Sequence, residues 1–297
     1  MPPRGVEPPR RREATKNGLY KTGFVASCLR GVILTAAMSA AACAPRLTKL
    51  PSGTGTPAPD FAQVVVDATA GCRGVQSLSA EIAVTGSIGG DRARVRLVAG
   101  FAPAAGRIEA AAPFGAPLFI FVASGADGTL FFPRDDRVVE HGRPEELLEA
   151  VAGVPLAAAD LLPTMTGCAM PQPVAGGQAL GDNWRTAAGS GGAKIYLHRD
   201  NASSPWHLVT VFNPGQRQQW SWRADYDDFH DGLPHVIRFV SADRDRFNIQ
   251  LTLSQIELNP ALGPEVFRVE VPRDAERITI DDLRRPGARP PAKTRSR

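Results

Sequence analysis

The chain has 297 residues, a formal net charge of +4 at pH 7 and an isoelectric point near 9.1. The positive charge lies at the two ends, because residues 31–283 hold 21 Lys and Arg against 28 Asp and Glu, a net charge of −7. This central part lacks the basic face interleaved with aromatic residues that nucleic-acid binders carry, so that class of function is excluded.

The first apolar run of the chain covers residues 31–42 and follows a cationic stretch that ends at Arg30. Its length fits the roughly 7 to 15 residues of a secretory signal and falls short of the about 20 that cross a bilayer as a helix. It ends in Ala40-Ala41-Ala42-Cys43, which is similar to the bacterial lipobox, in which the cysteine is acylated. We therefore predict a signal peptide over residues 1–42, with an over-long start, and lipid attachment at Cys43. The alternatives are a signal without lipidation and a buried apolar helix.

A Thr/Pro/Gly-rich stretch over residues 43–59 predicts a lipidated linker between this anchor and the folded domain. Beyond it, two cysteines remain, Cys72 and Cys168. An even pair outside the cytoplasm predicts a disulfide, and closing a loop of this length contributes about 4 kcal/mol of stability through chain entropy. The alternative is two buried free thiols.

The domain that follows has a dominant hydrophobic period of two. Ala93, Val95 and Leu97 alternate with arginines, and Gly89-Gly90 separates this run from an earlier one, so we predict a hairpin. Further strands are predicted over residues 107–112, 118–123, 129–133, 194–198, 206–212, 218–226, 236–241, 247–254 and 266–271. So many short alternating strands indicate a mainly β fold, an antiparallel sheet with one covered face.

Helical signals are few. Asp60 is a predicted N-cap for an apolar stripe that runs to Ala68. Pro144 and two glutamates favour the start of a second helix, which ends before Gly153. A short third helix is predicted over residues 157–165, and we expect the helices to cover the open side of a curved sheet.

Two local motifs carry a resemblance to a known family. Ala112-Pro113-Phe114-Gly115 is similar to a Pro-Leu-Gly loop after the third strand, and residues 144–156 resemble a helix followed by Gly-x-Pro-Leu/Ile. Together with the order lipobox, linker, helix and hairpin, they resemble the LolB-like outer-membrane lipoproteins, which share the LolA-type fold. The predicted domains are therefore a LolB-like domain over residues 60–283 and a basic, disordered tail over residues 284–297.

The resemblance implies a curved, incomplete antiparallel β-barrel with short helices covering its open face, around an apolar cavity for acyl chains. It implies a bacterial outer-membrane lipoprotein, lipid-anchored and facing the periplasm, that binds membrane lipid and lipoprotein acyl chains. Such a protein accepts lipoproteins from a periplasmic LolA-like carrier and inserts them into the outer membrane. The alternative is a lipoprotein of the same fold that binds another apolar ligand or serves in envelope assembly.

In the family, the leucine of the Pro-Leu-Gly loop projects into solvent and helps deliver lipoproteins to the membrane. Phe114 holds that position here, so Pro113, Phe114 and Gly115 form the predicted membrane-insertion loop. An exposed aromatic side chain gains free energy by entering a bilayer interface. The alternative is that Phe114 folds back onto the sheet as ordinary core.

The candidates for the cavity are apolar residues at alternating strand positions. They are Ile82, Val84, Val95, Leu97, Phe119, Phe121, Leu130, Phe132, Trp220, Trp222, Phe239, Ile249 and Leu251. Most of these residues also fit a plain core.

No catalytic or metal-binding constellation is predicted. Residues 225–231 cluster carboxylates with His230, but they lack the spacing of a calcium loop and are interpreted as a solvated turn. The other histidines show no paired zinc spacing. We therefore expect a monomeric protein without enzymatic activity, metal, cofactor or nucleic-acid partner.

Overall fold

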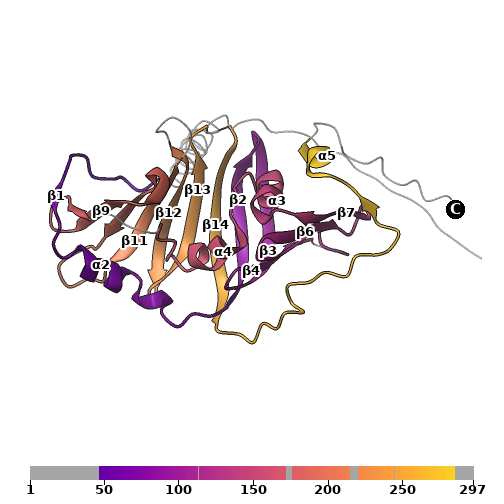
Figure 1. Cartoon of the computed structure of the whole chain (residues 1–297), viewed down its shortest axis with the longest axis horizontal. Helices are drawn as coiled ribbons and strands as arrows, with labels where there is room; N and C mark the ends of the chain where they lie inside the picture. The colour runs from indigo at the N-terminus through magenta and orange to yellow at the C-terminus, as the bar shows by residue number, and fades with distance from the viewer. Residues whose placement is uncertain (1–46, 113, 172–175, 215–219, 244, 285–297) are drawn as a thin grey trace, which may run out of the picture. The chain divides into compact units, whose positions relative to one another are not determined.

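The computed structural model describes residues 47–284, except residues 113, 172–175, 215–219 and 244. The predicted signal peptide, the predicted lipid-attachment site Cys43, Pro113 of the predicted membrane loop and the basic tail beyond Arg284 lie outside the described residues. The described part is drawn in colour in Figure 1.

One sheet of 15 strands runs through the described residues, in the order β1-β8-β9-β10-β11-β12-β13-β14-β2-β3-β4-β5-β6-β7-β15. Its strands are β1 Thr56–Pro57, β2 Leu78–Ile88, β3 Asp91–Ala102, β4 Ala105–Ala111, β5 Ile120–Ser124, β6 Asp127–Phe132, β7 Arg137–Gly142, β8 Gln178–Ala179, β9 Trp184–Ala188, β10 Lys194–His198, β11 His207–Pro214, β12 Trp220–His230, β13 Leu233–Ser241, β14 Phe247–Leu258 and β15 Glu276–Arg277. Only the pair β15 and β7 is parallel among the described strands. The ends β1 and β15 are not paired with each other, so the sheet stays open.

The predicted fold class is confirmed: the described part is mainly β, one curved, incomplete antiparallel sheet with few helices (Figure 1). The helices are α2 Phe61–Ala68, α3 Pro144–Ala152, α4 Ala158–Met165 and α5 Ile280–Arg284, with 3₁₀ turns η2 Ala70–Cys72 and η3 Ser190–Gly192. α3 contacts β6, and α4 contacts β3 and β4. The three predicted helices are therefore present, and two of them lie against one face of the sheet, which we call the inner face.

The hydrophobic period of two decides which side chains point to that face. In β2, every second residue from Leu78 to Val84 is buried, while Ala83 and Thr85, on either side of Val84, are exposed. Residues directly opposite each other on antiparallel strands share a face. Val84 pairs with Val95 of β3 and with Leu251 of β14, so all three point inward. Arg94 pairs with Thr85 and belongs to the opposite, outer face.

The disulfide between Cys72 and Cys168 is present, with Cα atoms 6.4 Å apart. Cys72 ends η2 and Cys168 lies just after α4, so the bond ties the segment before the hairpin to a helix on the inner face. Because the two residues are 96 positions apart, the bond restricts a large loop of the unfolded chain.

The predicted linker is held to the sheet from Thr48 on. The Thr48 amide donates to Asp225 Oδ2 at 3.0 Å, and its carbonyl oxygen accepts from Arg223 Nη2 at 2.7 Å. Residues 56 and 57 then form β1, which pairs with β8. In the sequence, only residues 44–47 separate this contact at Thr48 from Cys43.

Two local predictions are wrong. Residues 266–271 form no strand; Val269 and Val271 pack instead on Phe131, Val138 and Ala275, which explains their alternating pattern. Residues 225–231 are no solvated turn, because β12 continues to His230 and only the next two residues turn into β13. Asp60 occupies the N-cap position of α2, as predicted, but its side chain makes no capping hydrogen bond.

Candidate functional site

An apolar cavity of about 110 Å³ lies between the inner face and the two covering helices. Its walls come from β2, β3, β4, β13 and β14 on one side and from α3, α4 and the chain between them on the other. The lining residues are Val84, Ile88, Val95, Leu97, Ile108, Phe119, Leu148, Val151, Ala152, Val154, Leu156, Leu161, Met165, Phe239, Ile249 and Leu251. All sixteen are apolar, so the cavity offers a ligand dispersion contacts and no polar side chain.

Seven of the cavity residues were predicted from the sequence: Val84, Val95, Leu97, Phe119, Phe239, Ile249 and Leu251. Five of the other six candidates do not line it. Ile82, Phe121 and Leu130 are buried in the core, and Phe132 packs against that core. Trp222 lines a separate hollow of about 240 Å³ on the far side of α4. Trp220 begins β12, and its side chain lies outside the described part.

Sequence reasoning missed the helical side of the cavity. Leu148 and Val151 of α3 line the cavity, and nothing in the strand pattern placed a helix face over it. The following residues Val154 and Leu156 also line it, because Gly153 takes a left-handed φ of 75° and ends α3 there. The apolar stripe of the helix was the signal that could have identified these residues.

One end of the cavity is accessible to solvent. Ile88, Val95, Phe119 and Val151 line it and are only half-buried, whereas Ile108, Phe239 and Ile249 are buried. Phe119 is the last residue of the loop that connects β4 with β5, residues 112–119. The mouth of the cavity therefore lies beside this loop.

The loop at the mouth presents two large apolar side chains to water. Phe114 is 89% exposed, the largest value among the large apolar side chains that the structure describes, and Leu118 is 43% exposed. Gly115 has a φ of 80°, which suits glycine and turns the chain after Phe114. Arg134 braces the loop by donating to the carbonyl oxygens of Phe114 at 2.7 Å and of Ala116 at 2.9 Å. Phe114 does not fold back onto the sheet; it is held outward.

α3 closes the cavity through packing and a few polar contacts. Leu147 is fully buried against Gly128 and Gly142, where an added Cβ would lie 2.9 Å from its methyl groups. On the exposed side, Glu149 pairs with Arg246 at 2.6 Å and with Arg284 of α5 at 3.5 Å. Ion pairs this exposed contribute about 0–1 kcal/mol each, so the polar contacts hold α3 only weakly.

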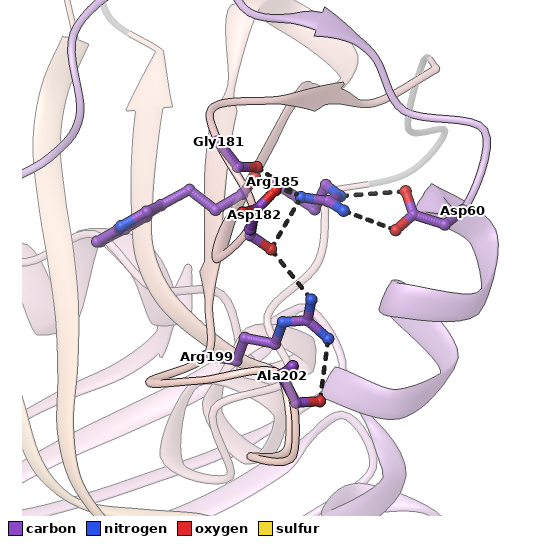
Figure 2. Close-up of polar contacts among 7 residues, drawn as sticks. Asp60, Gly181, Asp182, Arg185, Arg199 and Ala202 are labelled. Atoms are coloured by element: carbon purple, nitrogen blue, oxygen red, sulfur yellow. Dashed lines mark hydrogen bonds and ion pairs between the residues drawn. The ribbon is translucent and has the colours of Figure 1, made fainter.

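A cluster of charged residues at the opposite end of the sheet is structural. Figure 2 shows Arg185 between the carboxylate of Asp60 and the carbonyl oxygen of Gly181, and Arg199 donating to the backbone carbonyl oxygens of Asp182 and Ala202. Arg185 Nη2 lies 2.7 Å from Asp60 Oδ2, and this hydrogen bond holds the pKa of that carboxyl below its usual value. The cluster joins the start of α2 to β9, and of its guanidinium atoms only the buried Nε of Arg199 has no hydrogen-bond partner among the described residues.

The histidines of the described part offer no metal site. His198 contacts the Trp184 ring at a tilt of 40°, His207 stacks on Phe229, and burial lowers the pKa of both imidazoles. Within residues 47–284, outside the gaps, no group of three or more His, Cys, Asp or Glu side chains could hold a metal ion. No helix in this range is long and apolar enough to cross a membrane. The apolar cavity and its exposed loop are therefore the candidate site.

Comparisons with known proteins concern the fold only. No protein-family model matches the chain, and no curated protein sequence matches it. Among solved structures, an outer membrane lipoprotein-sorting protein domain from Vibrio parahaemolyticus has a TM-score of 0.47 and 12% identity, over 69% of this chain and 94% of that one. A LolA superfamily protein from Nitrosomonas europaea has a TM-score of 0.46 and 12% identity, over 73% and 99%. The lipoprotein LppX from Mycobacterium tuberculosis has a TM-score of 0.27 and 14% identity, over 69% and 98%.

Proposed function

We propose that the protein is a LolB-like lipoprotein that binds an acyl chain in the apolar cavity and passes it to the membrane at the Phe114 loop. The observation that carries the proposal is the position of the cavity mouth. Half-buried apolar residues, among them Val95 and Phe119, line the accessible end of the cavity, and the loop with Phe114 begins beside them. An acyl chain that leaves the cavity at this end meets the loop first.

The cavity has to widen before it takes a chain. Its volume of about 110 Å³ is below the roughly 300 to 1,000 Å³ of typical ligand pockets. The sheet side is built from paired strands, whereas α3 is a nine-residue helix held outside by the exposed pairs of Glu149. The element that moves is therefore α3, which uncovers Leu97 and its neighbours as it leaves the sheet.

In this proposal the chain is anchored through acylated Cys43 in the bacterial outer membrane and faces the periplasm. It receives lipoproteins from a periplasmic LolA-like carrier and releases their acyl chains into the same membrane. The apolar lining supports a binding function, since the cavity has no polar side chain that could act as an acid, a base or a nucleophile. We therefore propose a transfer factor and not an enzyme.

Filling the cavity tests this proposal. Ala152 lines the cavity, and Ala150 on the same helix does not. Because a tryptophan at position 152 occupies the space that an acyl chain needs, we expect Ala152→Trp to weaken binding of cis-parinaric acid by about tenfold or more. The fluorescence titration uses the full chain, and Ala150→Trp serves as the matched control with unchanged affinity. Equal affinity of both variants and the wild type would show that the fatty acid binds elsewhere.

A further inference from the structure

Three exposed arginines form a row on the outer face of β3. Arg92, Arg94 and Arg96 occupy alternate positions and therefore point the same way, across about 14 Å of strand. Their partners on β2 are Ser87, Thr85 and Ala83, which carry no charge. None of the three guanidinium groups forms an ion pair with a residue in the described part of the chain. We call these three residues the arginine row.

On β2, β3 and β4, the acids of this face lie toward the other end of the strands. Val98, which follows the row, pairs with Glu81 on one side and with Glu109 on the other, and Glu109 is bound by Arg107. Asp91 begins the strand, but its position alternates with Arg92, so it belongs to the inner face. On these three strands the charge of the outer face is thus polarised, with the positive end next to the Gly89-Gly90 turn, while Asp225 and Asp227 of β12 lie on the same face in register with Arg94 and Arg96.

The chain after β14 covers only the negative end of this face. Arg107 donates to the carbonyl oxygens of Val266 and Arg268, and Leu262 lies 3.4 Å from the position of a Cβ on Gly100. The arginine row is left open to solvent. Arg96 pairs with Ala111, the last residue of β4, and the loop that carries Phe114 follows directly. The positive charge of the arginine row therefore lies beside this loop.

The start of the described chain is fixed on the same outer face. Asp225 accepts a hydrogen bond from the Thr48 amide and lies opposite Arg238 on the next strand. From Arg238, the directly opposite residues on successive strands are Gln250, Thr85 and Arg94. Opposite residues share a face, and four strand spacings separate Asp225 from Arg94, about 19 Å. Thr48 is five residues from Cys43, which limits the reach of an anchor at Cys43 to about 17 Å. A lipid anchor at Cys43 therefore keeps the outer face close to the bilayer.

We propose that the arginine row docks on the phosphate groups of anionic phospholipids, so that the domain rests on the membrane with the Phe114 loop at the contact. The positive charge of the arginine row complements the negative charge of lipid phosphate groups. The short segment between Cys43 and Thr48 also keeps the outer face near the bilayer, so a membrane is the partner that fits this face. The inference rests on the proposed function for its lipid-anchored setting, and it adds the surface and the headgroup chemistry that orient the domain. Each basic residue near an anionic membrane strengthens binding about fivefold, so the row contributes of the order of 100-fold.

The test measures partition of the full chain onto vesicles of phosphatidylcholine alone and onto vesicles that also contain phosphatidylglycerol. The variant Arg92→Gln/Arg94→Gln/Arg96→Gln is compared with Arg73→Gln/Lys194→Gln/Arg268→Gln, which removes the same charge from exposed positions away from the row. We expect the first variant to bind the phosphatidylglycerol vesicles about 100-fold more weakly, with little change on phosphatidylcholine. The control variant should differ from the wild type by less than about fivefold.

Equal losses in the two variants would overturn the inference, since bulk charge would then explain the binding, and so would no loss in either. Circular dichroism confirms that both variants fold. Titration with cis-parinaric acid separates this inference from the proposed function, because the arginine row does not line the cavity. If the chain binds the fatty acid but phosphatidylglycerol does not strengthen its binding to vesicles, only the docking surface is contradicted. If vesicle binding depends on the arginine row but no fatty acid binds, only the proposed cavity is contradicted.

Discussion

Replacing Phe114 by glutamate is expected to abolish delivery of a bound lipoprotein into the membrane while leaving the fold intact. Phe114 is 89% exposed and does not line the cavity, so the free energy of unfolding and the affinity for an acyl chain should not change. Burial of a phenylalanine side chain in an apolar phase is worth roughly 2 kcal/mol, about a 30-fold effect. A carboxylate loses this contribution and adds the cost of bringing a charge to the bilayer interface.

The measurement is transfer of a fluorescent lipoprotein from its complex with the full chain into phospholipid vesicles. Val66→Glu is the matched control, because Val66 is an exposed apolar residue, 44% exposed, on α2 and away from the loop. We expect transfer by the control at the wild-type rate. If Phe114→Glu transferred lipoprotein as fast as the control, the loop would have no part in delivery.

The largest expected loss of stability follows Asp225→Ala. Asp225 is buried and accepts from Arg223 Nε at 2.6 Å and from Thr210 Oγ1 at 2.8 Å, besides the amide of Thr48. Its removal leaves the Arg223 guanidinium, which is 11% exposed, without its carboxylate. Breaking a buried pair in this way costs about 3–5 kcal/mol.

Urea unfolding of the full chain, followed by circular dichroism, measures this loss. Asp227→Ala is the control, because this carboxylate lies two residues further along β12 and is exposed, and we expect it to change stability by less than about 0.5 kcal/mol. A loss below about 1 kcal/mol for Asp225→Ala would mean that the pair does not fix the start of the domain to the sheet.

Local pattern was sufficient to predict the central hairpin and the covering helices. The alternation of Ala93, Val95 and Leu97 gave β3 correctly, because one-sided burial imposes a period of two. Which of the two faces is the inner one came from the structure alone. Pro144 and Gly153 marked both ends of α3, since each suits its backbone position there. The same reasoning placed Val95, Leu97 and Leu251 on the wall that became the cavity.

What failed depended on contacts between distant parts of the chain. Residues 266–271 alternate because they pack on the outside of β6 and β7, a role that no local signal separates from a strand. Asp60 has the residue type of a helix cap, yet Arg185, 125 positions away, takes its carboxylate. The linker composition gave no sign that Thr48 is held by Asp225.

The most direct test of the account locates a bound acyl chain. The full chain is incubated with palmitate that carries a diazirine at its methyl end, irradiated and digested, and the labelled peptides are identified by mass spectrometry. We expect label on the peptides that contain Val95, Leu97, Phe119 and Val151. In Ala152→Trp we expect these peptides to lose the label. Label confined to the hollow at Trp222 or to the surface around His198, with none on the cavity residues, would contradict the account.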